Sequence, residues 1–201
     1  SPQHTHKVPY LILPHLTPDL PIYLLWLNNL TNPTIDSFLN LSTCTLLNSG
    51  NYKDLSIFSN LIKEKQKNTH CSFSDLNWLT IQPWKLSLAR LFKRSDRLNS
   101  LKNTNLIEIE YSNIPLPFNS YPITPALYLM GWLSSRMNWT LVSGLEHTFI
   151  YDSPEGEKKI RLTPHAPYSN SPILRVKIKT LFNELFDLKT LKNEDFLLVN
   201  V

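Results

Sequence analysis

Glycine is scarce in this chain, with only 4 among 201 residues. Loops that wrap a phosphate in backbone amides need several closely spaced glycines, so the fingerprints of nucleotide- and dinucleotide-binding sites are absent. The strained G-x-S-x-G turn of the serine hydrolases is absent as well. These two absences argue against an ATP- or NAD-dependent enzyme of the common kinds and against a serine hydrolase.

Cysteine and long apolar runs are also rare. The two cysteines, Cys44 and Cys71, cannot build the disulfide framework of a small secreted protein, and they form no C-x-x-C metal motif. No apolar run approaches the roughly 18 residues of a membrane span, and no signal peptide is recognisable. We therefore expect a soluble, intracellular protein with no membrane partner and no metal.

Charge of either sign is moderate. The 20 basic and 16 acidic side chains give a formal net charge of +4, spread along the chain. A nucleic-acid-binding protein usually carries a dense basic stripe, so we expect no nucleic-acid partner. The content of 42% hydrophobic and 18% charged residues is ordinary for a globular protein, and the length suffices for one good core or two small ones.

The apolar patterning predicts an α/β fold, with a mostly parallel or mixed sheet flanked by helices and an antiparallel C-terminal extension. Residues 20–27 (LPIYLLWL) form a continuous apolar run that is typical of a strand buried on both faces. Pro83 and Pro125 suit the first turns of two helices; Thr124 can cap the second, and Gly131 can allow a neighbouring backbone to approach it. The other expected elements are strands over residues 43–47, 107–111, 174–178 and 196–201, a hairpin of residues 147–151 with 158–163, and helices over residues 54–67 and 181–191.

Differences in residue composition and in the expected secondary structure divide the sequence into three ranges. Residues 1–9 are interpreted as a linker or an appended tail, and residues 10–140 as an α/β domain. Residues 141–201 are expected to form antiparallel strands plus a helix, packed on the same domain. The chain begins with Ser1 and not with methionine, which suggests a fragment or a processed form.

Three groups of polar residues are candidate sites, and each has a plainer interpretation. His70 and Cys71 lack metal-ligand spacing, so they are interpreted as a surface histidine beside an incidental cysteine. Glu108 and Glu110 alternate with inward-facing isoleucines and are interpreted as exposed, solvated carboxylates, not as an acid/base pair. The third group, interpreted as a solvated outer face of a sheet, consists of Lys158, Lys159, Arg161, Arg175, Lys177 and Lys179.

The tryptophans are more informative. Trp26 and Trp132 are interpreted as core residues. Trp78 and Trp84 lie where a loop is expected to meet a helix, among charged residues. Aromatic residues ringed by polar groups are typical of the hot spots of protein interfaces, so an interface role and a core role both stay open for these two.

Four motifs, in a fixed order, carry a family resemblance. They are residues 16–26 (LTPDLPIYLLW), 35–37 (IDS), 75–78 (DLNW) with 82–85 (QPWK), and 129–139 (LMGWLSSRMNW). In this order the chain resembles the family of the glucose-6-phosphate dehydrogenase assembly protein OpcA, whose patterns read PDLPV-x-LWW, I-D-S, DLAW…TPWR and LAGWLASRLGW. Leu25 stands in place of a tryptophan of the family, Gln82 in place of a threonine and Lys85 in place of an arginine.

The resemblance implies a non-catalytic, cytoplasmic factor of the pentose phosphate pathway that has no cofactor. Such a factor binds glucose-6-phosphate dehydrogenase and acts as an allosteric activator by favouring the active oligomer. We expect Trp78 and Trp84 to be apolar anchors of this contact, and Lys85 cannot make the two-pronged contact of the family's arginine. The expected partner-binding residues are Asp75, Trp78, Pro83, Trp84, Lys85 and Arg136.

Two other function classes stay open. One is a sugar-phosphate-binding domain or a cryptic enzyme, because open α/β sheets commonly hold ligands at the carboxyl ends of their strands. The other is a nucleic-acid-binding module that uses the basic face near the C-terminal end. The sequence leaves self-association undetermined.

Overall fold

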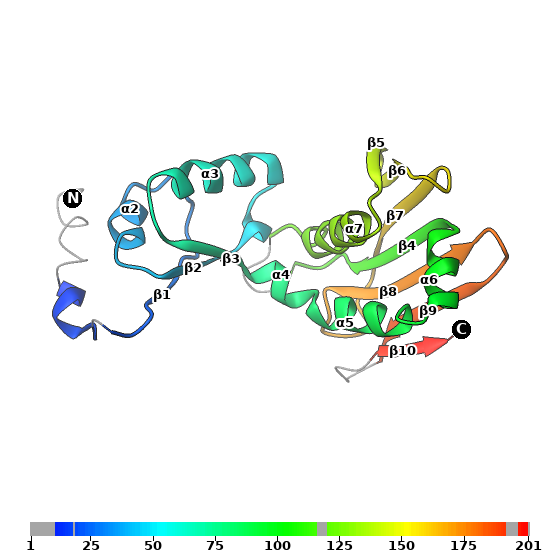
Figure 1. Ribbon diagram of the computed structural model, residues 1–201. Helices are drawn as coiled ribbons and strands as arrows, with labels where there is room; N and C mark the ends of the chain where they lie inside the picture. Colours follow the sequence, from blue (N-terminus) through cyan, green and yellow to red (C-terminus); the bar gives the residue numbers. More distant parts are fainter. Residues whose placement is uncertain (1–10, 18, 116–119, 192–196, 201) are drawn as a thin grey trace. The chain divides into compact units, whose positions relative to one another are not determined.

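The computed structural model describes residues 11–17, 19–115, 120–191 and 197–200, and it divides into two compact units (Figure 1). Unit 1 is Ser1–Leu76 and unit 2 is Asn77–Val201. The ranges 1–9, 10–140 and 141–201 follow motifs and chain character, whereas the units follow contacts between residues. Those three ranges therefore stay a prediction.

Unit 1 is a three-stranded parallel sheet, in the order β1-β2-β3, together with the helices α2 and α3. Asp54 accepts a hydrogen bond from the Ser56 amide and caps α3, which confirms the helix expected over residues 54–67. The small core gathers around Ile35 and Phe58, and Trp26 packs against it half-buried. The elements of unit 1 are η2 (Leu13–His15), β1 (Tyr23–Leu25), α2 (Thr34–Leu39), β2 (Cys44–Leu47), η3 (Ser49–Asn51), α3 (Leu55–Lys67) and β3 (Ser72–Asp75).

The strand expected over residues 20–27 is present, but the expectation that it is buried on both faces is wrong. Only Tyr23–Leu25 form β1, and Tyr23 is 66% exposed. The reason is its place in the sheet: among the described residues β1 pairs only with β2, so it is an edge strand, and only Leu24 of its three residues packs on the core. A continuous apolar run does not by itself distinguish a central strand from an edge strand.

Unit 2 is a seven-stranded mixed sheet with helices packed against it, as Figure 1 shows. The strand order is β10-β9-β8-β4-β7-β6-β5; β4 is parallel to β7, and the other pairs are antiparallel. This architecture confirms the predicted fold class. The elements of unit 2 are α4, which begins at the last residue of unit 1 (Leu76–Thr80), α5 (Gln82–Leu91), α6 (Ser95–Lys102), β4 (Thr104–Ser112), α7 (Thr124–Arg136), β5 (Thr140–Leu145), β6 (Thr148–Asp152), β7 (Lys158–His165), β8 (Ile173–Thr180), β9 (Leu185–Thr190) and β10 (Leu197–Asn200).

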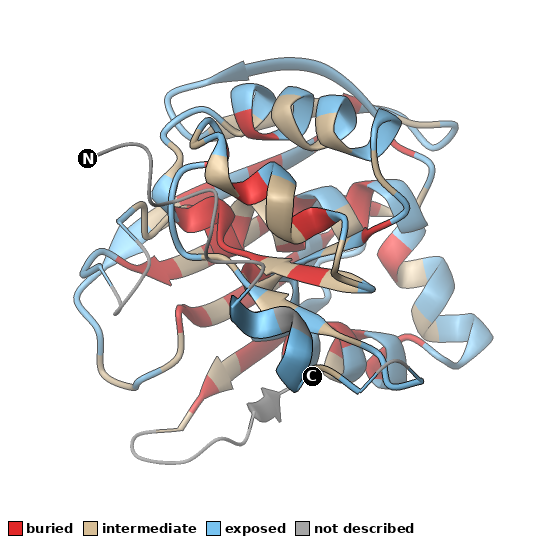
Figure 2. Ribbon diagram, turned by 90° about the vertical axis from the view of Figure 1, so that its left-hand side faces the viewer, coloured by how far each residue is buried: buried red, intermediate tan, exposed pale blue. Residues whose placement is uncertain are grey.

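The core of unit 2 lies between the sheet and the helices. Ile107 and Ile109 of β4 are fully buried and belong to one cluster with Trp84 and Leu88 of α5 and Leu129 of α7. Figure 2 shows buried residues, in red, on both strands and helices. The alternation of side chains along a strand turns Glu108 and Glu110, which alternate with those isoleucines, to the other side of the sheet.

The helix expected over residues 181–191 is wrong: this segment is the turn after β8 and the strand β9. Its apolar residues fit a helical repeat, but Phe186 and Leu188 also fit a strand, and pairing with β8 fills the inner face of the sheet with both. Asn183 makes the turn with a φ of 62°, a left-handed conformation that asparagine tolerates. The closing strand expected over residues 196–201 is confirmed as β10 over its described residues.

Two expectations about α7 are also wrong. Thr124 is not its cap: the residue at the cap position is Ile123, no side chain caps the helix end, and Thr124 is buried inside the first turn. Gly131 is exposed, and a Cβ placed on it would meet nothing within 4 Å, so no neighbouring backbone needs a glycine there. The proline expected in the first turn is confirmed at Pro125.

Candidate functional site

The tryptophan motif of residues 75–85 folds as the end of β3 followed by α4 and α5. Pro83 lies in the first turn of α5, as predicted, where its missing amide leaves no hydrogen bond unmade. Ile81, at the junction of α4 and α5, is fully buried and ties the junction to the core. The motif therefore sets the start of α5 against the sheet and leaves the outer side of α4 at the surface.

Trp78, Lys85 and Tyr128 form a three-residue corner at the surface of unit 2. The ammonium of Lys85 lies 3.8 Å from the centroid of the Trp78 ring, in cation–π geometry. The rings of Trp78 and Tyr128 meet edge to face, with centroids 6.0 Å apart at 68°. The motif of residues 75–85 thus contacts α7 at Tyr128, the residue just before the motif of residues 129–139. Trp78 stays 40% exposed.

Lys85 carries a charge in a mostly buried place. Its residue is 9% exposed, and burial lowers the pKa of its ammonium. No ion pair of Lys85 occurs within the described part of the chain, so the Trp78 ring is the group that faces this charge. A carboxylate brought in by a partner would offset the cost of burying it.

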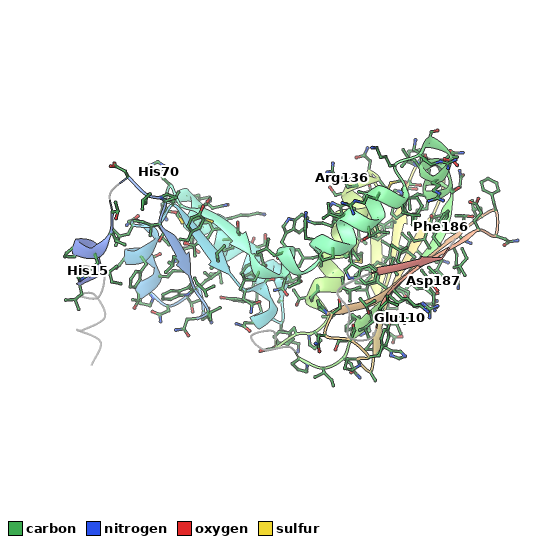
Figure 3. All side chains as sticks on the ribbon, turned by 90° about the horizontal axis from the view of Figure 1, so that it is seen from below. His15, His70, Glu110, Arg136, Phe186 and Asp187 are labelled. Atoms are coloured by element: carbon green, nitrogen blue, oxygen red, sulfur yellow. The ribbon has the colours of Figure 1, made fainter. Side chains whose placement is uncertain are left out.

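The other expected site residues fall into different places. Trp84 is 1% exposed and belongs to the core, so it supports α5 from the inside and presents no surface. Asp75 belongs to unit 1, where its carboxylate accepts a hydrogen bond from the Ser49 amide at 3.3 Å. Arg136 is exposed in the last turn of α7, and Figure 3 shows it on the helix side of unit 2.

Arg136 lines a groove of about 230 Å³ between α5, α6 and α7. The interior of the groove is almost wholly apolar, and Arg136 is the only charged residue in its lining. The residues that line this helical groove are Leu88, Ala89, Phe92, Leu98, Leu101, Trp132, Leu133, Arg136 and Met137. Sequence reasoning missed all of these except Arg136, although the helical spacing of the apolar residues in α5 and α7 was a usable signal.

The corner and the helical groove share the same two helices. Tyr128, Trp132 and Arg136 follow one another at intervals of four along α7, so they lie in one row of about 12 Å. Lys85 and Phe92 lie seven residues apart on α5, which also puts them on one side of that helix. The corner therefore lies nearer the first turns, and the groove nearer the last turns, of the same two helices.

The sheet face away from the helices is a separate charged surface. Glu108 contacts Lys179 at 3.1 Å and Arg161 at 3.4 Å, and Glu110 contacts Lys177 at 3.1 Å. The side chains of the two glutamates are only 18% and 16% exposed, so the expectation of freely solvated carboxylates is wrong.

The expected basic face is present with one exception. Lys158 is 1% exposed on the inner face, because alternation along β7 places it on the side of Ile160 and Leu162. Its ammonium lies 3.5 Å from the Glu155 carbonyl, and burial lowers its pKa. Arg161, Arg175, Lys177 and Lys179 pair with acidic residues of neighbouring strands, and Lys159 pairs with Glu157 of the preceding turn at 3.3 Å, which makes the face a mixed one.

Other kinds of site find no support in the part of the chain that the structure describes. No group of three or more histidine, cysteine, aspartate or glutamate side chains there could hold a metal ion. Within the same residues, no helix combines the length and the apolar character that crossing a membrane requires.

Comparison with known proteins bears on the same region. The family model for the C-terminal domain of the glucose-6-phosphate dehydrogenase subunit matches residues 71–180, more than half of the chain. The putative OxPP cycle protein OpcA of Synechocystis sp. is 30% identical over 81 residues, which are 40% of this chain and 16% of that protein. This chain thus corresponds to a small part of that relative's length.

Among solved structures, an oxidoreductase from Sinorhizobium meliloti is similar with a TM-score of 0.53 and 13% sequence identity. The match covers 96% of this chain and 61% of the oxidoreductase. At this level of identity the similarity concerns the fold alone. The matched family region contains the whole corner and the whole helical groove.

Proposed function

This chain belongs to the family of the glucose-6-phosphate dehydrogenase assembly protein OpcA, and from that premise we propose that it binds glucose-6-phosphate dehydrogenase and promotes the active oligomer. The factor is non-catalytic and works in the cytoplasm. The observation that carries the proposal is the exposed aromatic corner, where the first tryptophan motif contacts α7 at Tyr128, the residue just before the second motif. There the Trp78 ring faces the ammonium of Lys85, which has no ion pair among the described residues.

The proposed mechanism is thermodynamic linkage. A factor that binds the assembled enzyme more tightly than the inactive form shifts the population towards the assembled one. A coupling free energy of about 1 to 3 kcal/mol corresponds to a roughly 5- to 150-fold change in the equilibrium. Surface complementarity alone can supply such a difference, so no reacting group is needed in this chain.

The site residues divide into contact and support. Trp78 is the apolar anchor, because a large aromatic side chain at the surface with a charged neighbour is typical of interface hot spots. Lys85 and Arg136 offer positive charge to carboxylates of the enzyme. Trp84 and Pro83 support the contact indirectly by fixing the position of α5. Asp75 is the last residue of β3 in unit 1, where it accepts a hydrogen bond from the Ser49 amide.

The direct test is to mix the chain with glucose-6-phosphate dehydrogenase of the same organism. Co-elution on a sizing column and the rate of NADP reduction are followed together over a range of enzyme concentrations. We expect co-elution, a larger enzyme oligomer and a higher rate, with the gain greatest at low enzyme concentration, where the oligomer dissociates. A folded chain that neither co-elutes nor changes the rate would refute the proposal.

Trp78→Ala tests the anchor. We expect it to weaken enzyme binding at least roughly tenfold, because hot-spot truncations commonly cost 2 kcal/mol or more. The matched control is Leu86→Ala, which removes an exposed apolar side chain of α5 outside the groove lining and leaves binding unchanged. Equal binding by the two variants, each with an unchanged thermal unfolding curve, would show that Trp78 is not an anchor.

A further inference from the structure

The helical part of unit 2 carries an excess of positive over negative charge. Residues 77–102 and 124–137, which we call the helical layer, contain seven basic side chains and one acidic side chain, a formal net charge of +6. The whole chain has a net charge of only +4, so the rest of it is net negative. The basic residues of the helical layer are Lys85, Arg90, Lys93, Arg94, Arg97, Lys102 and Arg136.

Most of these charges have no opposite charge beside them. The single acidic residue, Asp96, pairs with Arg94 at 2.9 Å. The six other cations of the layer make no ion pair with any residue that the structure describes. Like charges gathered without counter-charges raise the local potential, which favours the arrival of a negatively charged partner.

The helical groove combines this charge with an apolar interior. Leu98, which is 38% exposed, and Trp132 give it apolar walls, and Arg136 stands at the last turn of α7. Lys102 lies one helical turn beyond Leu98 on α6 and is exposed. Apolar side chains of a partner could pack inside the groove, while its carboxylates could pair with Arg136 and Lys102.

We propose that the helical groove binds an acidic amphipathic segment of a protein partner, with apolar side chains inside the groove and a carboxylate on Arg136. This rests on the proposed function, in which the partner is the dehydrogenase, and it adds the chemistry of the contacting segment. A helix or an extended segment of about 12 Å, the length of the Tyr128–Arg136 row, is long enough to reach from the groove to the corner.

Other occupants fit the chemistry less well. A sugar phosphate needs several converging hydrogen-bond donors, and the groove lining has one charged side chain among apolar ones. A second copy of this chain would bring a second layer of net charge +6 against the first, which is repulsive. A nucleic acid would satisfy the charge and would leave the aliphatic interior, including Leu88 and Leu98, unused.

A pair of charge reversals tests the proposal against the enzyme. Arg136→Glu changes a residue of the groove lining, whereas Arg90→Glu makes the same change on the opposite side of α5, midway between Leu88 and Phe92. We expect Arg136→Glu to raise the Kd for glucose-6-phosphate dehydrogenase about tenfold or more, and Arg90→Glu to raise it less than about threefold. Leu98→Asn removes an apolar wall of the groove without adding a charge, and we expect it to weaken binding as well. If the two reversals have equal effects, the groove is not the contact.

A second arm does not depend on the enzyme. Two labelled synthetic amphipathic helices are compared by fluorescence anisotropy, both with leucine on one face, and with glutamate or lysine on the other. The unaltered chain should bind the glutamate peptide at least roughly tenfold more tightly than the lysine peptide, and Arg136→Glu should reduce that preference. If the chain bound the glutamate peptide but not the enzyme, the proposed function would be refuted, whereas the inference that the groove binds acidic amphipathic segments would stand.

Three outcomes of the peptide arm would overturn the inference. They are equal affinity for the two peptides, no saturable binding of the glutamate peptide, and its displacement by a single-stranded oligonucleotide. Dimerisation of the unaltered chain that Arg136→Glu abolishes would assign the groove to a second copy instead. Circular dichroism of each variant confirms that the fold is retained, as expected for changes at exposed residues.

Discussion

The two faces of unit 2 carry similar numbers of basic residues and use them in opposite ways. On the open face of the sheet, Arg161, Glu108, Lys177 and Asp187 lie directly opposite one another on four adjacent strands, so charge alternates across the sheet. Arg175 adds a two-pronged contact to Asp187, at 2.7 and 2.6 Å. Figure 3 shows Glu110 and Asp187 on this face, away from Arg136.

In the helical layer only one of the seven basic residues has an acidic partner within the described chain. Cross-strand pairing supplies counter-charges to a sheet, because register places side chains opposite each other. The helices have no such internal register with an acidic surface. The difference suggests that charge on the sheet face serves the fold, whereas charge on the helical layer is left for a partner.

Among the variants that test this difference between the two faces, we expect the largest change in stability when an acidic residue of the sheet face is removed. Asp187→Ala leaves Arg175 half-buried without its two-pronged partner, and we expect unfolding free energy to fall by roughly 2 to 3 kcal/mol. Asp96→Ala is the control: it breaks the exposed pair with Arg94 and removes the acid from the first turn of α6, so we expect a clearly smaller loss of stability. Urea unfolding of both variants measures the difference, and equal stability of the two would remove the structural role of the sheet charges.

Acid should weaken the sheet face in a defined direction. Arg175 donates two hydrogen bonds to the Asp187 carboxylate and thereby lowers its pKa below the ordinary 3.8. A carboxylate whose pKa is lower in the folded state stabilises the fold above its unfolded pKa, and this stabilisation disappears as the pH falls below 3.8 through the folded pKa. Unfolding free energy should therefore fall more steeply below that pH in the unaltered chain than in Asp187→Asn. Parallel pH profiles would contradict the assignment.

A smaller effect is expected for the mostly buried cation of the helical layer. Lys85→Met keeps the apolar stem and removes the charge, whose burial already lowers the pKa of the ammonium. We expect stability to stay within about 1 kcal/mol of the unaltered chain or to rise, because no ion pair within the described residues is lost. Binding of glucose-6-phosphate dehydrogenase should weaken in the same variant. A loss of stability as large as that of Asp187→Ala would place Lys85 among the structural charges.

The smallest effect on stability should be that of Arg136→Gln. This exposed side chain makes no ion pair with the described residues, so unfolding free energy should change by less than about 0.5 kcal/mol. Added salt should lower the affinity of the unaltered chain for the enzyme more than the affinity of this variant, because salt screens the charge of Arg136, which the variant lacks. Equal salt dependence would argue that Arg136 faces no carboxylate.

Much of the fold followed from local patterns. The helices that begin near Asp54 and Pro83, the hairpin of β6 and β7, and the strand β4 were predictable because each has a cap, a proline in its first turn or a clean alternation. The segment of β9 was not, since its apolar spacing fits both a helix and a strand. Pairing with β8, a contact outside the segment, decides between them.

The candidate site was only partly predictable. The motif around Trp78 and Trp84 marks the stretch of chain that forms part of the corner, yet the sequence could not tell the surface tryptophan from the core one. The inward position of Lys158 was available from alternation with Ile160 and was overlooked. The helical groove needs three helices to come together, so no single segment of the sequence contains it.

By itself, the sequence determined the α/β class and the family, because periodicity and motif order are local properties of the chain. Only the tertiary structure decided that Lys85 lies on Trp78, that Glu108 and Glu110 are paired, and that Arg136 borders an apolar groove. Each of these depends on which distant segments pack together. Packing fixes burial and charge neighbours, and those two quantities separate a residue that holds the fold from one that can meet a partner.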